Sequence, residues 1–313
     1  MARYGIGLIG LGKIATDQHV PVIAADPDFE VVAVASQRGE SLPGLAQSYR
    51  DWQDLLRDAK GVDAVAICTP PQVRYVIARA ALSAGKHVLL EKPPAATVSE
   101  LVDLQRRSTA AGLTLFATWH SQFNAGVEEA RRQLAGRQIR RLEVTWKEDV
   151  RHWHPGQAWI WEPGGFGVFD PGINALSIVT RIMPTPLFVR SATLSFPANR
   201  AAPIAADLVF AATGGADETL SAVFDWRQTG KQSWDIAVET QDGLHLLLAE
   251  GGSKLSINGK PAVEEPSREY QGIYRRFAAL LSGGGTDVDA DPFRLVADAF
   301  LVGRRVEVEP FED

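Results

Sequence analysis

The sequence predicts an α/β protein: a doubly wound parallel sheet, followed by an α+β part with a large, mostly antiparallel and open-faced sheet. From residue 4 to about 120, short β-branched runs alternate with amphipathic stretches, as expected when helices cover both faces of a parallel sheet. After residue 137, strand-like stretches follow one another with few helices between them. The length of 313 residues exceeds that of a usual single core and so favours two domains.

The elements of the N-terminal part follow from these runs. Helices are expected near 13–19, 51–58, 72–83 and 97–111. Thr97 is the expected N-cap of the last helix, with Glu100 three residues on. Pro21 should end or kink the first helix. The expected strands are Tyr4–Ile9, Val31–Ala35, Ala64–Cys68, His87–Leu90 and Thr114–Ala117.

The pattern of the C-terminal part predicts a sheet followed by helices. Asn258-Gly259 lies between two short apolar runs and predicts a hairpin turn. The stretches Tyr270–Leu281 and Phe293–Val306 have helical spacing of apolar residues, and a glycine-rich loop separates them. Strands are expected at 139–150, 187–196, 206–212, 218–226 and 234–249.

Composition narrows the class of protein. A formal net charge of −6 argues against nucleic-acid and anionic-membrane partners, whose sites carry a basic excess. The N-terminus lacks the pattern of a secretory signal, and no apolar run is long enough to span a bilayer. A single cysteine, Cys68, excludes an intramolecular disulfide and a multi-cysteine zinc site. We therefore expect a cytoplasmic protein with small-molecule partners.

A glycine-rich turn follows the first strand, with the pattern G-x-G-x-x-A at Gly10, Gly12 and Ala15. A second register, which begins at Gly5 and Gly7, would put the tight turn inside the strand, so we prefer the first. Glycines between a strand and a helix let the backbone approach a pyrophosphate at the helix N-terminus. Glycines also serve ordinary turns, but the order strand, turn, helix favours a dinucleotide.

The end of the second strand bears on the choice between NADP and NAD. An NAD-specific site normally has Asp or Glu here to bind the ribose hydroxyls, but this chain has Ser36-Gln37-Arg38. A guanidinium can bind a 2′-phosphate in bidentate fashion, and the hydroxyl adds a donor. The missing carboxylate favours NADP. NAD stays the alternative, because a loop arginine can simply be solvated.

Lys92 follows the strand His87–Leu90 directly, within Glu91-Lys92-Pro93-Pro94. Ligands of open α/β sheets bind beyond the carboxyl ends of the strands. The two prolines make a rigid turn, with a cis bond as one option, that fixes the direction of the lysine side chain. An arbitrary lysine would be a surface ammonium, but this one is a candidate for chemistry.

Residues 146–174 combine aromatic and polar side chains. A single tryptophan is more often a core residue, and a single histidine is more often structural. Only the combination of these side chains in one segment indicates a binding site. Ring C–H faces of a carbohydrate pack on aromatic rings, while its hydroxyls need donors and acceptors. The cluster therefore favours a sugar. Its members are Trp146, Trp153, Trp159, Trp161, Glu148, His152, His154, Asp170 and Asn174.

A metal site is the competing interpretation of His152 and His154. On a strand, both side chains would point to one face, and carboxylates lie nearby in the sequence. A catalytic zinc site, however, needs three convergent ligands and an open position. In the oxidation of an alcohol, the nicotinamide itself accepts the hydride, so no metal is needed for this role. We predict no metal site.

Several of these motifs, in their order, resemble the glucose–fructose oxidoreductase/inositol dehydrogenase (Gfo/Idh/MocA) family over the whole chain. The resemblance implies a Rossmann domain at 1–121 and a substrate-binding and oligomerisation domain at 122–313, whose C-terminal helix can pack back on the first domain. It also implies a homo-oligomer, a dimer through the C-terminal sheet. The motifs are Gly10-x-Gly12-x-x-Ala15, Thr69-Pro70-Pro71, Ala84-Gly85-Lys86-His87-Val88 and Glu91-Lys92-Pro93.

Three further segments resemble the bacterial aldose 1-dehydrogenases of this family, which act on L-arabinose and D-galactose. The implied reaction oxidises C1 of a pyranose to the lactone, with hydride transfer to NADP or NAD. Two positions depart from the wider family: Asn174 and Arg74 stand where many members have histidine, and asparagine cannot act as a base. The aldose 1-dehydrogenases resemble this chain at both positions. The segments are Trp119-His120-Ser121, 146–157 and Gly167–Asn174.

The expected roles are as follows. Lys92 and Asp170 are the catalytic candidates, and the sequence leaves open which of them takes the proton. The resemblance implies substrate contacts from Glu148, His154, Asn174, His120, Trp153 and Trp234. Cofactor contacts are expected from Gly10, Gly12, Lys13, Ile14, Ser36, Gln37, Arg38, Thr69, Pro70, Glu91 and Lys92.

Three rival functions stay open at this point. One is an interaction module built on the antiparallel sheet, which would bind no nucleotide. An inositol dehydrogenase or another sugar dehydrogenase of the same family would differ only in its substrate. A non-catalytic NADP-binding sensor would use the glycine turn, while Lys92 and Asp170 would be structural.

Overall fold

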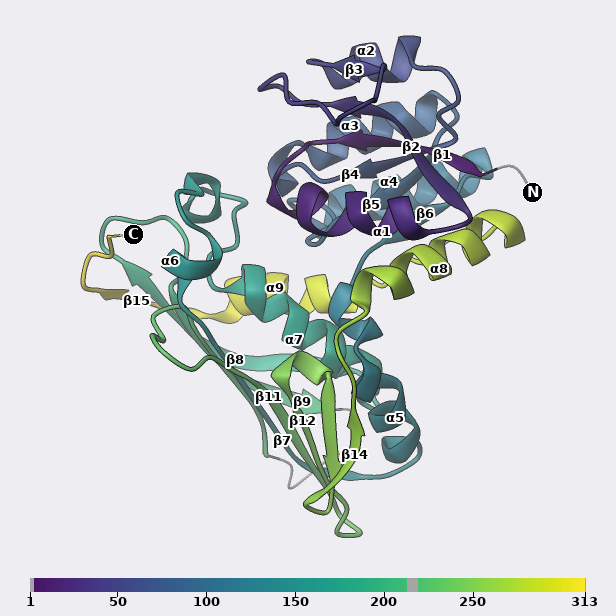
Figure 1. Ribbon diagram of the computed structural model, residues 1–313. Helices are drawn as coiled ribbons and strands as arrows, with labels where there is room; N and C mark the ends of the chain where they lie inside the picture. Colours follow the sequence, from purple (N-terminus) through teal and green to yellow (C-terminus); the bar gives the residue numbers. More distant parts are fainter. Residues whose placement is uncertain (1–2, 213–218, 313) are drawn as a thin grey trace. The chain divides into compact units, whose positions relative to one another are not determined.

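The computed structural model describes residues 3–212 and 219–312, which form two compact units (Figure 1). The first unit takes the chain up to His120 together with Tyr270–Ala290. The second takes Ser121–Glu269 and the chain from Asp291 on. Each unit has its own sheet and core. The functional domains expected at 1–121 and 122–313 stay a prediction.

Sheet A of the first unit has six parallel strands in the order β3-β2-β1-β4-β5-β6. Most of their paired residues are buried and apolar, as in a sheet covered on both faces. The predicted doubly wound parallel sheet is confirmed. The strands are β1 (Tyr4–Ile9), β2 (Phe29–Ala35), β3 (Ser48–Tyr49), β4 (Ala64–Ile67), β5 (His87–Leu90) and β6 (Leu115–Ala117).

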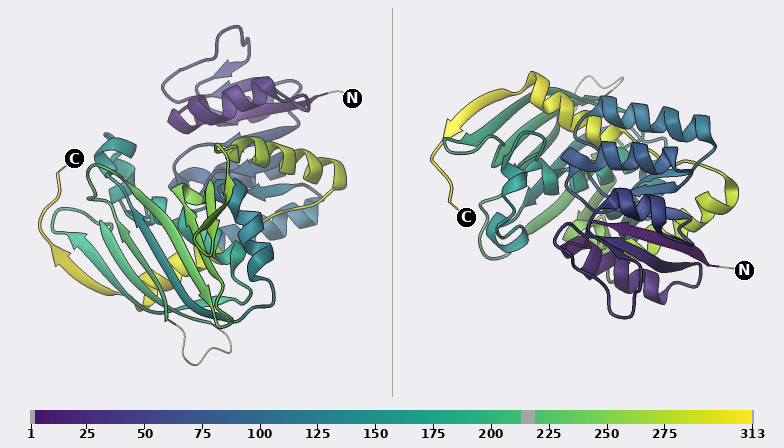
Figure 2. Two further views of the ribbon diagram at one scale, coloured as in Figure 1. Left: turned by 60° about the horizontal axis from the view of Figure 1, so that its bottom comes forward. Right: turned by 90° about the horizontal axis from the view of Figure 1, so that it is seen from above.

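Helices lie on both faces of sheet A, with α1 (Val20–Ala25) on one and α3 (Pro71–Ser83) and α4 (Val98–Ala111) on the other (Figure 2). The short helix α2 (Trp52–Asp58) follows β3. The predicted cap of α4 is confirmed. The Thr97 hydroxyl accepts the Glu100 N–H, and the Glu100 carboxylate accepts the Thr97 N–H, which completes a capping box.

The helical segment after β1 does not end at Pro21. Residues Ala15–His19 form a π-helix, and Pro21 lies in the first turn of α1, which continues to Ala25. A first-turn proline costs little, because the N–H that it lacks would have no partner inside the helix. Of the two predicted effects of Pro21, an end or a kink, the end is therefore wrong. The segment changes from π to α geometry next to Pro21.

Helix α8 (Glu269–Gly283), which covers the predicted helical stretch Tyr270–Leu281, contributes to the core of the first unit. The ring of Phe277 stacks on Phe29 of β2 and on Phe116 of β6. Tyr274 packs edge-on against Phe29 as well. This helix therefore closes the aromatic core over sheet A.

Sheet B of the second unit has nine strands in the order β14-β13-β12-β11-β7-β10-β9-β8-β15. Only the pairs β7–β10 and β8–β15 are parallel among the strands described, so the mostly antiparallel sheet is confirmed. Residue 218 of the predicted strand 218–226 lies outside the described residues. The strands are β7 (Ile139–Lys147), β8 (Leu187–Pro197), β9 (Ala205–Ala212), β10 (Thr219–Asp225), β11 (Ser233–Thr240), β12 (His245–Ala249), β13 (Lys254–Ile257), β14 (Lys260–Glu264) and β15 (Arg304–Val308).

One face of sheet B carries α5 (Ala125–Leu134), α7 (Phe169–Ile182) and α9 (Asp291–Val302), and the left view of Figure 2 looks onto the opposite face. The sequence does not reveal α7, since Pro171 and Gly172 near its start are poor helix formers. Pro171 lies in the first turn, and a Cβ atom at Gly172 would lie 3.0 Å from the Phe224 ring. Glycine therefore lets α7 pack closely on β10.

Two features near the end of the chain test the sequence predictions. Asn258 and Gly259, both with positive φ, form the hairpin turn between β13 and β14, as predicted. The predicted helix Phe293–Val306 is wrong after residue 302, where α9 ends. Residues 304–308 pair with β8 as the parallel strand β15.

Among the described residues, no helix has both the length and the apolar character needed to cross a membrane.

The capping box of α4 gives a stability prediction. Thr97→Ala removes the acceptor for the Glu100 N–H and should lower the free energy of unfolding by about 1 kcal/mol. Ser99→Ala, at an exposed position inside the same helix, is the matched control and should change it by less than about 0.5 kcal/mol. Chemical denaturation measures both, and equal effects would contradict the role of the cap.

Candidate functional site

The predicted cofactor residues lie beyond the carboxyl ends of four strands of sheet A. Because the strands are parallel, these ends meet at one edge, where α/β proteins bind their ligands. Four segments form this edge: 10–14 after β1, 36–38 after β2, 69–70 after β4 and 91–92 after β5. The structure thus brings together residues that are far apart in the sequence.

Gly10 and Gly12 form the turn between β1 and the following helical segment. Gly10 has a φ of +92°, and a Cβ atom there would lie 3.0 Å from the backbone of Cys68 and Thr69. No atom lies within 4 Å of a Cβ position at Gly12, so this glycine borders open space. A pyrophosphate can therefore approach the backbone here, and the turn fits a dinucleotide.

The competing glycine register is explained by packing. Gly5 and Gly7 both lie inside β1, and a Cβ atom at Gly5 would come within 1.8 Å of the Gly61 carbonyl oxygen. Close packing, against the Gly61 backbone at Gly5 and against buried side chains at Gly7, accounts for these two glycines rather than phosphate binding. Of the other predicted contacts in this segment, Lys13 pairs through its ammonium with Asp17 on the exposed surface, and Ile14 precedes the π-helix.

The loop after β2 contains a carboxylate that the sequence reasoning missed. The Ser36 hydroxyl donates to Glu40 Oε2 at 2.9 Å, and Arg38 Nη2 lies 3.1 Å from Glu40 Oε1. Gln37, between them, is exposed. The residue after β2 is Ser36 and not an acid, but the carboxylate of Glu40, four residues after Ser36, reaches back to it.

The turn that carries Lys92 is held from two sides. The Lys92 N–H donates to Glu91 Oε2 at 3.0 Å, and the Lys92–Pro93 peptide bond is cis. The buried Arg74 donates from Nη1 to the Glu91 carbonyl at 2.6 Å and also to the Pro93 carbonyl. Its Nε donates to the Thr69 carbonyl at 2.7 Å. Arg74 therefore ties the turn after β5 to the loop after β4.

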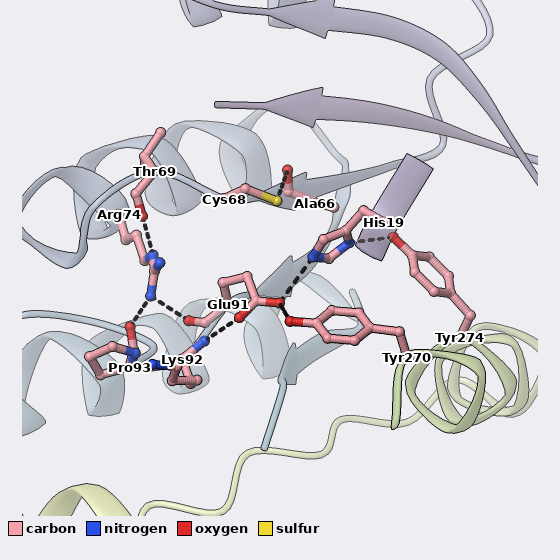
Figure 3. A network of polar contacts seen from close by, with 10 residues as sticks. All are labelled: His19, Ala66, Cys68, Thr69, Arg74, Glu91, Lys92, Pro93, Tyr270 and Tyr274. Atoms are coloured by element: carbon pink, nitrogen blue, oxygen red, sulfur yellow. Dashed lines mark hydrogen bonds and ion pairs between the residues drawn. The ribbon is translucent and has the colours of Figure 1, made fainter. Parts of the chain in front are cut away.

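The Glu91 side chain is the centre of a buried polar network (Figure 3). Its Oε1 accepts the Tyr270 hydroxyl at 2.7 Å and lies 2.9 Å from Nε2 of His19. The other ring nitrogen of His19 lies 2.7 Å from the Tyr274 hydroxyl oxygen. The network joins the end of the π-helix, the Lys92 turn and the first turns of α8. No sequence pattern indicates this role for His19, Tyr270 or Tyr274.

The network shifts the pKa of both ionisable partners. Burial alone would raise the pKa of Glu91, but the His19 hydrogen bond and the nearby cationic groups outweigh it and lower the pKa to about 2. Burial alone would lower the pKa of His19, whereas Cys68, Tyr274 and Glu91 together leave it well above its ordinary value. The pair is therefore a buried ion pair, His19 positive and Glu91 negative.

In the second unit, a buried carboxylate lies among tryptophans. Glu148 follows β7 and is 6% exposed. Its Oε1 accepts the indole N–H of Trp226 at 3.2 Å, and its Oε2 accepts that of Trp234 at 2.9 Å. The sequence reasoning missed Trp226, which is wholly buried and also contacts the ring of Trp161. The two indoles fix the orientation of the carboxylate.

Asp170, His154 and Asn174 lie together in the second unit. Asp170 is in the first turn of α7 and is 2% exposed. Its Oδ2 lies 3.5 Å from His154 Nε2. Asn174 follows one helical turn later and is part-exposed, on the same side of the helix as Asp170. A carboxylate, an imidazole and an amide thus converge, a set that can bind hydroxyl groups.

The segment that holds the histidines is not a strand. Asp149 caps the short helix α6 (Val150–Trp153) through the Arg151 N–H, so the expectation of a strand through residue 150 is wrong. Exposed His152 packs on Trp153, whereas His154 faces Asp170. The two histidines do not share one face.

The remaining predicted sugar contacts divide between the units. Trp153 is 38% exposed and packs edge-on against Trp234, with ring centroids 5.5 Å apart. These rings belong to the second unit. His120 belongs to the first unit, where it stacks on Tyr270.

Comparison with known proteins now identifies the family. Residues 4–118 match the Gfo/Idh/MocA model, described as an oxidoreductase family with an NAD-binding Rossmann fold. A galactose 1-dehydrogenase from Pseudomonas fluorescens is 46% identical over 308 residues, which cover 98% of each chain. The chain belongs to the Gfo/Idh/MocA oxidoreductase family. The predicted family, the oxidoreductase class and the nicotinamide dinucleotide cofactor are confirmed.

Solved structures agree with this assignment. The crystal structure of a D-galactose-1-dehydrogenase from Rhizobium etli has a TM-score of 0.93 and 52% identity, and the match covers 100% of this chain and 99% of that one. A 3-ketoreductase from Actinomadura kijaniata, in complex with TDP-benzene and NADP, has a TM-score of 0.83 at 19% identity, with 98% and 100% coverage. The latter likeness shows the fold alone.

The buried ion pair gives a prediction with a defined pH window. The folded pKa of Glu91 is lowered, so its contribution to stability is present above about pH 4.3 and is lost as the pH falls toward 2. The folded pKa of His19 is raised, so its contribution is present below about pH 6.5 and is lost as the pH rises through the raised value. The pair should therefore contribute most between these limits.

Glu91→Gln should lower the free energy of unfolding by roughly 3 kcal/mol near pH 6, because it leaves a buried imidazolium unpaired. The loss should shrink toward either end of the pH window. Denaturation curves from pH 3 to pH 9 measure it. Glu30→Gln, at an exposed position of β2, is the matched control and should have little effect at any pH. A loss that is the same at every pH would refute the ion pair.

Proposed function

We propose that the protein is an NAD(P)-dependent aldose 1-dehydrogenase, which oxidises C1 of a pyranose such as D-galactose or L-arabinose to the lactone. The observation that carries this proposal is the similarity along the whole chain to two galactose 1-dehydrogenases, at 46% and 52% identity. The buried Glu148 among tryptophans supports a sugar substrate independently, because it combines ring faces with a fixed hydroxyl acceptor.

The reaction removes two hydrogens from the sugar. A bound oxidised nicotinamide would supply the acceptor for the C1 hydrogen as hydride, and the proton of O1 would leave as the C1–O1 double bond forms. Lys92 and Asp170 are the groups that we propose for that proton. The fixed turn around Lys92 holds its backbone in place, and Asp170, buried beside His154, can accept a proton or orient the sugar.

The sugar contacts that we propose follow the chemistry of each side chain. Glu148, His154 and Asn174 bind ring hydroxyls, since their oxygens and nitrogens supply both acceptors and donors. Trp153 and Trp234 offer apolar ring faces, and His120 contributes a further wall. Trp226 and Trp234 donate to the two carboxylate oxygens of Glu148 and so fix the orientation of this acceptor.

Three further proposals concern cofactor choice, assembly and location. Arg38 and Ser36 favour NADP over NAD, because a guanidinium and a hydroxyl can both donate hydrogen bonds to a 2′-phosphate.

The face of sheet B away from its helices forms a homodimer contact, supported by Val209 and Leu247, which are 44% and 40% exposed there. A cytoplasmic location stays a proposal based on the single cysteine.

A substrate panel tests the proposed function. D-galactose, L-arabinose, D-glucose and myo-inositol are each mixed with the protein and NADP or NAD, and the absorbance of reduced nicotinamide is followed. We expect D-galactose and L-arabinose to give the highest rates, with an aldonolactone or its hydrolysed acid detected by mass spectrometry. Oxidation of inositol alone would make the protein a different sugar dehydrogenase. Tight cofactor binding without oxidation of any sugar would indicate a sensor.

Lys92→Ala should reduce turnover by about a thousandfold, because a general base contributes on this scale. Cofactor affinity, measured by titration without sugar, should change far less. Lys60→Ala, at an exposed position of the same unit, is the matched control and should leave turnover intact. If Lys92→Ala retains turnover within a few-fold of the unsubstituted enzyme, Lys92 is not the base.

A further inference from the structure

The loop after β2 presents a cation and an anion at the place where the adenosine ribose of a dinucleotide is expected. Ser36 is 5% exposed, and its hydroxyl points to Glu40. Glu40 also pairs with Arg38, and these two side chains are 41% and 72% exposed. Glu40 therefore occupies both groups that would bind a 2′-phosphate.

A second guanidinium lies beside the same loop. The short strand β3 pairs with the end of β2, with Tyr49 opposite Ala35, so Arg50 and Ser36 leave the sheet side by side. A Cβ atom at Gly39 would lie 3.3 Å from both Nε and Nη2 of Arg50, which places this guanidinium over the loop. Among the described residues, no carboxylate pairs with Arg50. It is a cation whose charge is not neutralised within this loop.

We propose that Ser36, Arg38, Glu40 and Arg50 form a selectivity site for the 2′ position of the cofactor ribose. In this site Glu40 opposes a 2′-phosphate, and Arg50 is a second cation for it. The inference rests on the proposed function, because it takes this edge of sheet A as the site of NADP or NAD. It adds two selectivity residues, Glu40 and Arg50, to the predicted Ser36 and Arg38.

The two cofactors make opposite demands on Glu40. The 2′-hydroxyl of NAD can donate to its carboxylate, the role that an acid at the end of β2 has in NAD-specific folds. The 2′-phosphate of NADP carries nearly two negative charges at neutral pH, so Glu40 must leave Arg38 and Ser36 to the phosphate. An exposed ion pair is worth little, so this exchange is easy. The site accordingly accepts both cofactors, and Glu40 limits the preference for NADP.

The test is a titration of the full-length protein with NADP and with NAD in the absence of sugar. Glu40→Gln should tighten NADP binding roughly fivefold, on the scale of one partly exposed charge contact. NAD binding should stay equal or weaken. Asp54→Asn, which removes one exposed negative charge from α2 of the same unit, should leave the ratio of the two affinities unchanged.

Arg50→Ala should weaken NADP roughly fivefold and NAD by less than about twofold, and Arg38→Ala should do the same or more. Arg57→Ala, an exposed arginine of α2, is the matched control. Raising the ionic strength should shrink the effects of Glu40→Gln and Arg50→Ala, because exposed charges are screened by salt.

The possible results separate the two proposals. An unchanged affinity ratio in Glu40→Gln, or one shifted toward NAD, overturns the role of Glu40. Equal losses for both cofactors in Arg50→Ala overturn the role of Arg50. Normal binding and selectivity with no oxidation of any aldose would contradict the proposed activity alone. Failure of the unsubstituted protein to bind either cofactor would overturn both.

Discussion

The buried carboxylate of Glu91 is the interaction on which the first unit depends. It accepts hydrogen bonds from the Lys92 backbone and from Tyr270, and it forms an ion pair with His19. A buried charge is stabilising only when its partners are complete, since an unpaired ion in the interior costs several kcal/mol. The segments that supply these partners must therefore stay in place, and so must the turn that presents Lys92. Arg74 fixes the same turn from the other side.

In the second unit, Glu148 is likewise a buried carboxylate that hydrogen-bond donors hold in place. One indole N–H group donates to each oxygen, so the carboxylate has a defined orientation in an aromatic surrounding. Tryptophan is suited to this role because it offers an apolar ring and a single donor. A rigid acceptor beside ring faces can distinguish one arrangement of sugar hydroxyls from another.

Sequence patterns predicted the parts that depend on local chemistry. The glycine turn at Gly10, the capping box of Thr97 and the hairpin at Asn258 each follow from a few neighbouring residues. Features set by distant contacts were not predictable. Helix α7 forms despite Pro171 because burial against sheet B outweighs weak local propensity. His19 meets Glu91 across a separation of 72 residues in the sequence, and Glu40 returns to Ser36 through a loop.

Hydrogen exchange of the Lys92 amide tests most directly the claim that Glu91 holds this turn. Pro93 and Pro94 have no N–H, so a peptide from this region reports on Lys92 with few other amides. We expect slow exchange in the unsubstituted protein. In Glu91→Ala, exchange at Lys92 should be at least about tenfold faster under conditions in which the rest of sheet A stays protected. Equal exchange in both proteins would show that the carboxylate does not hold the turn.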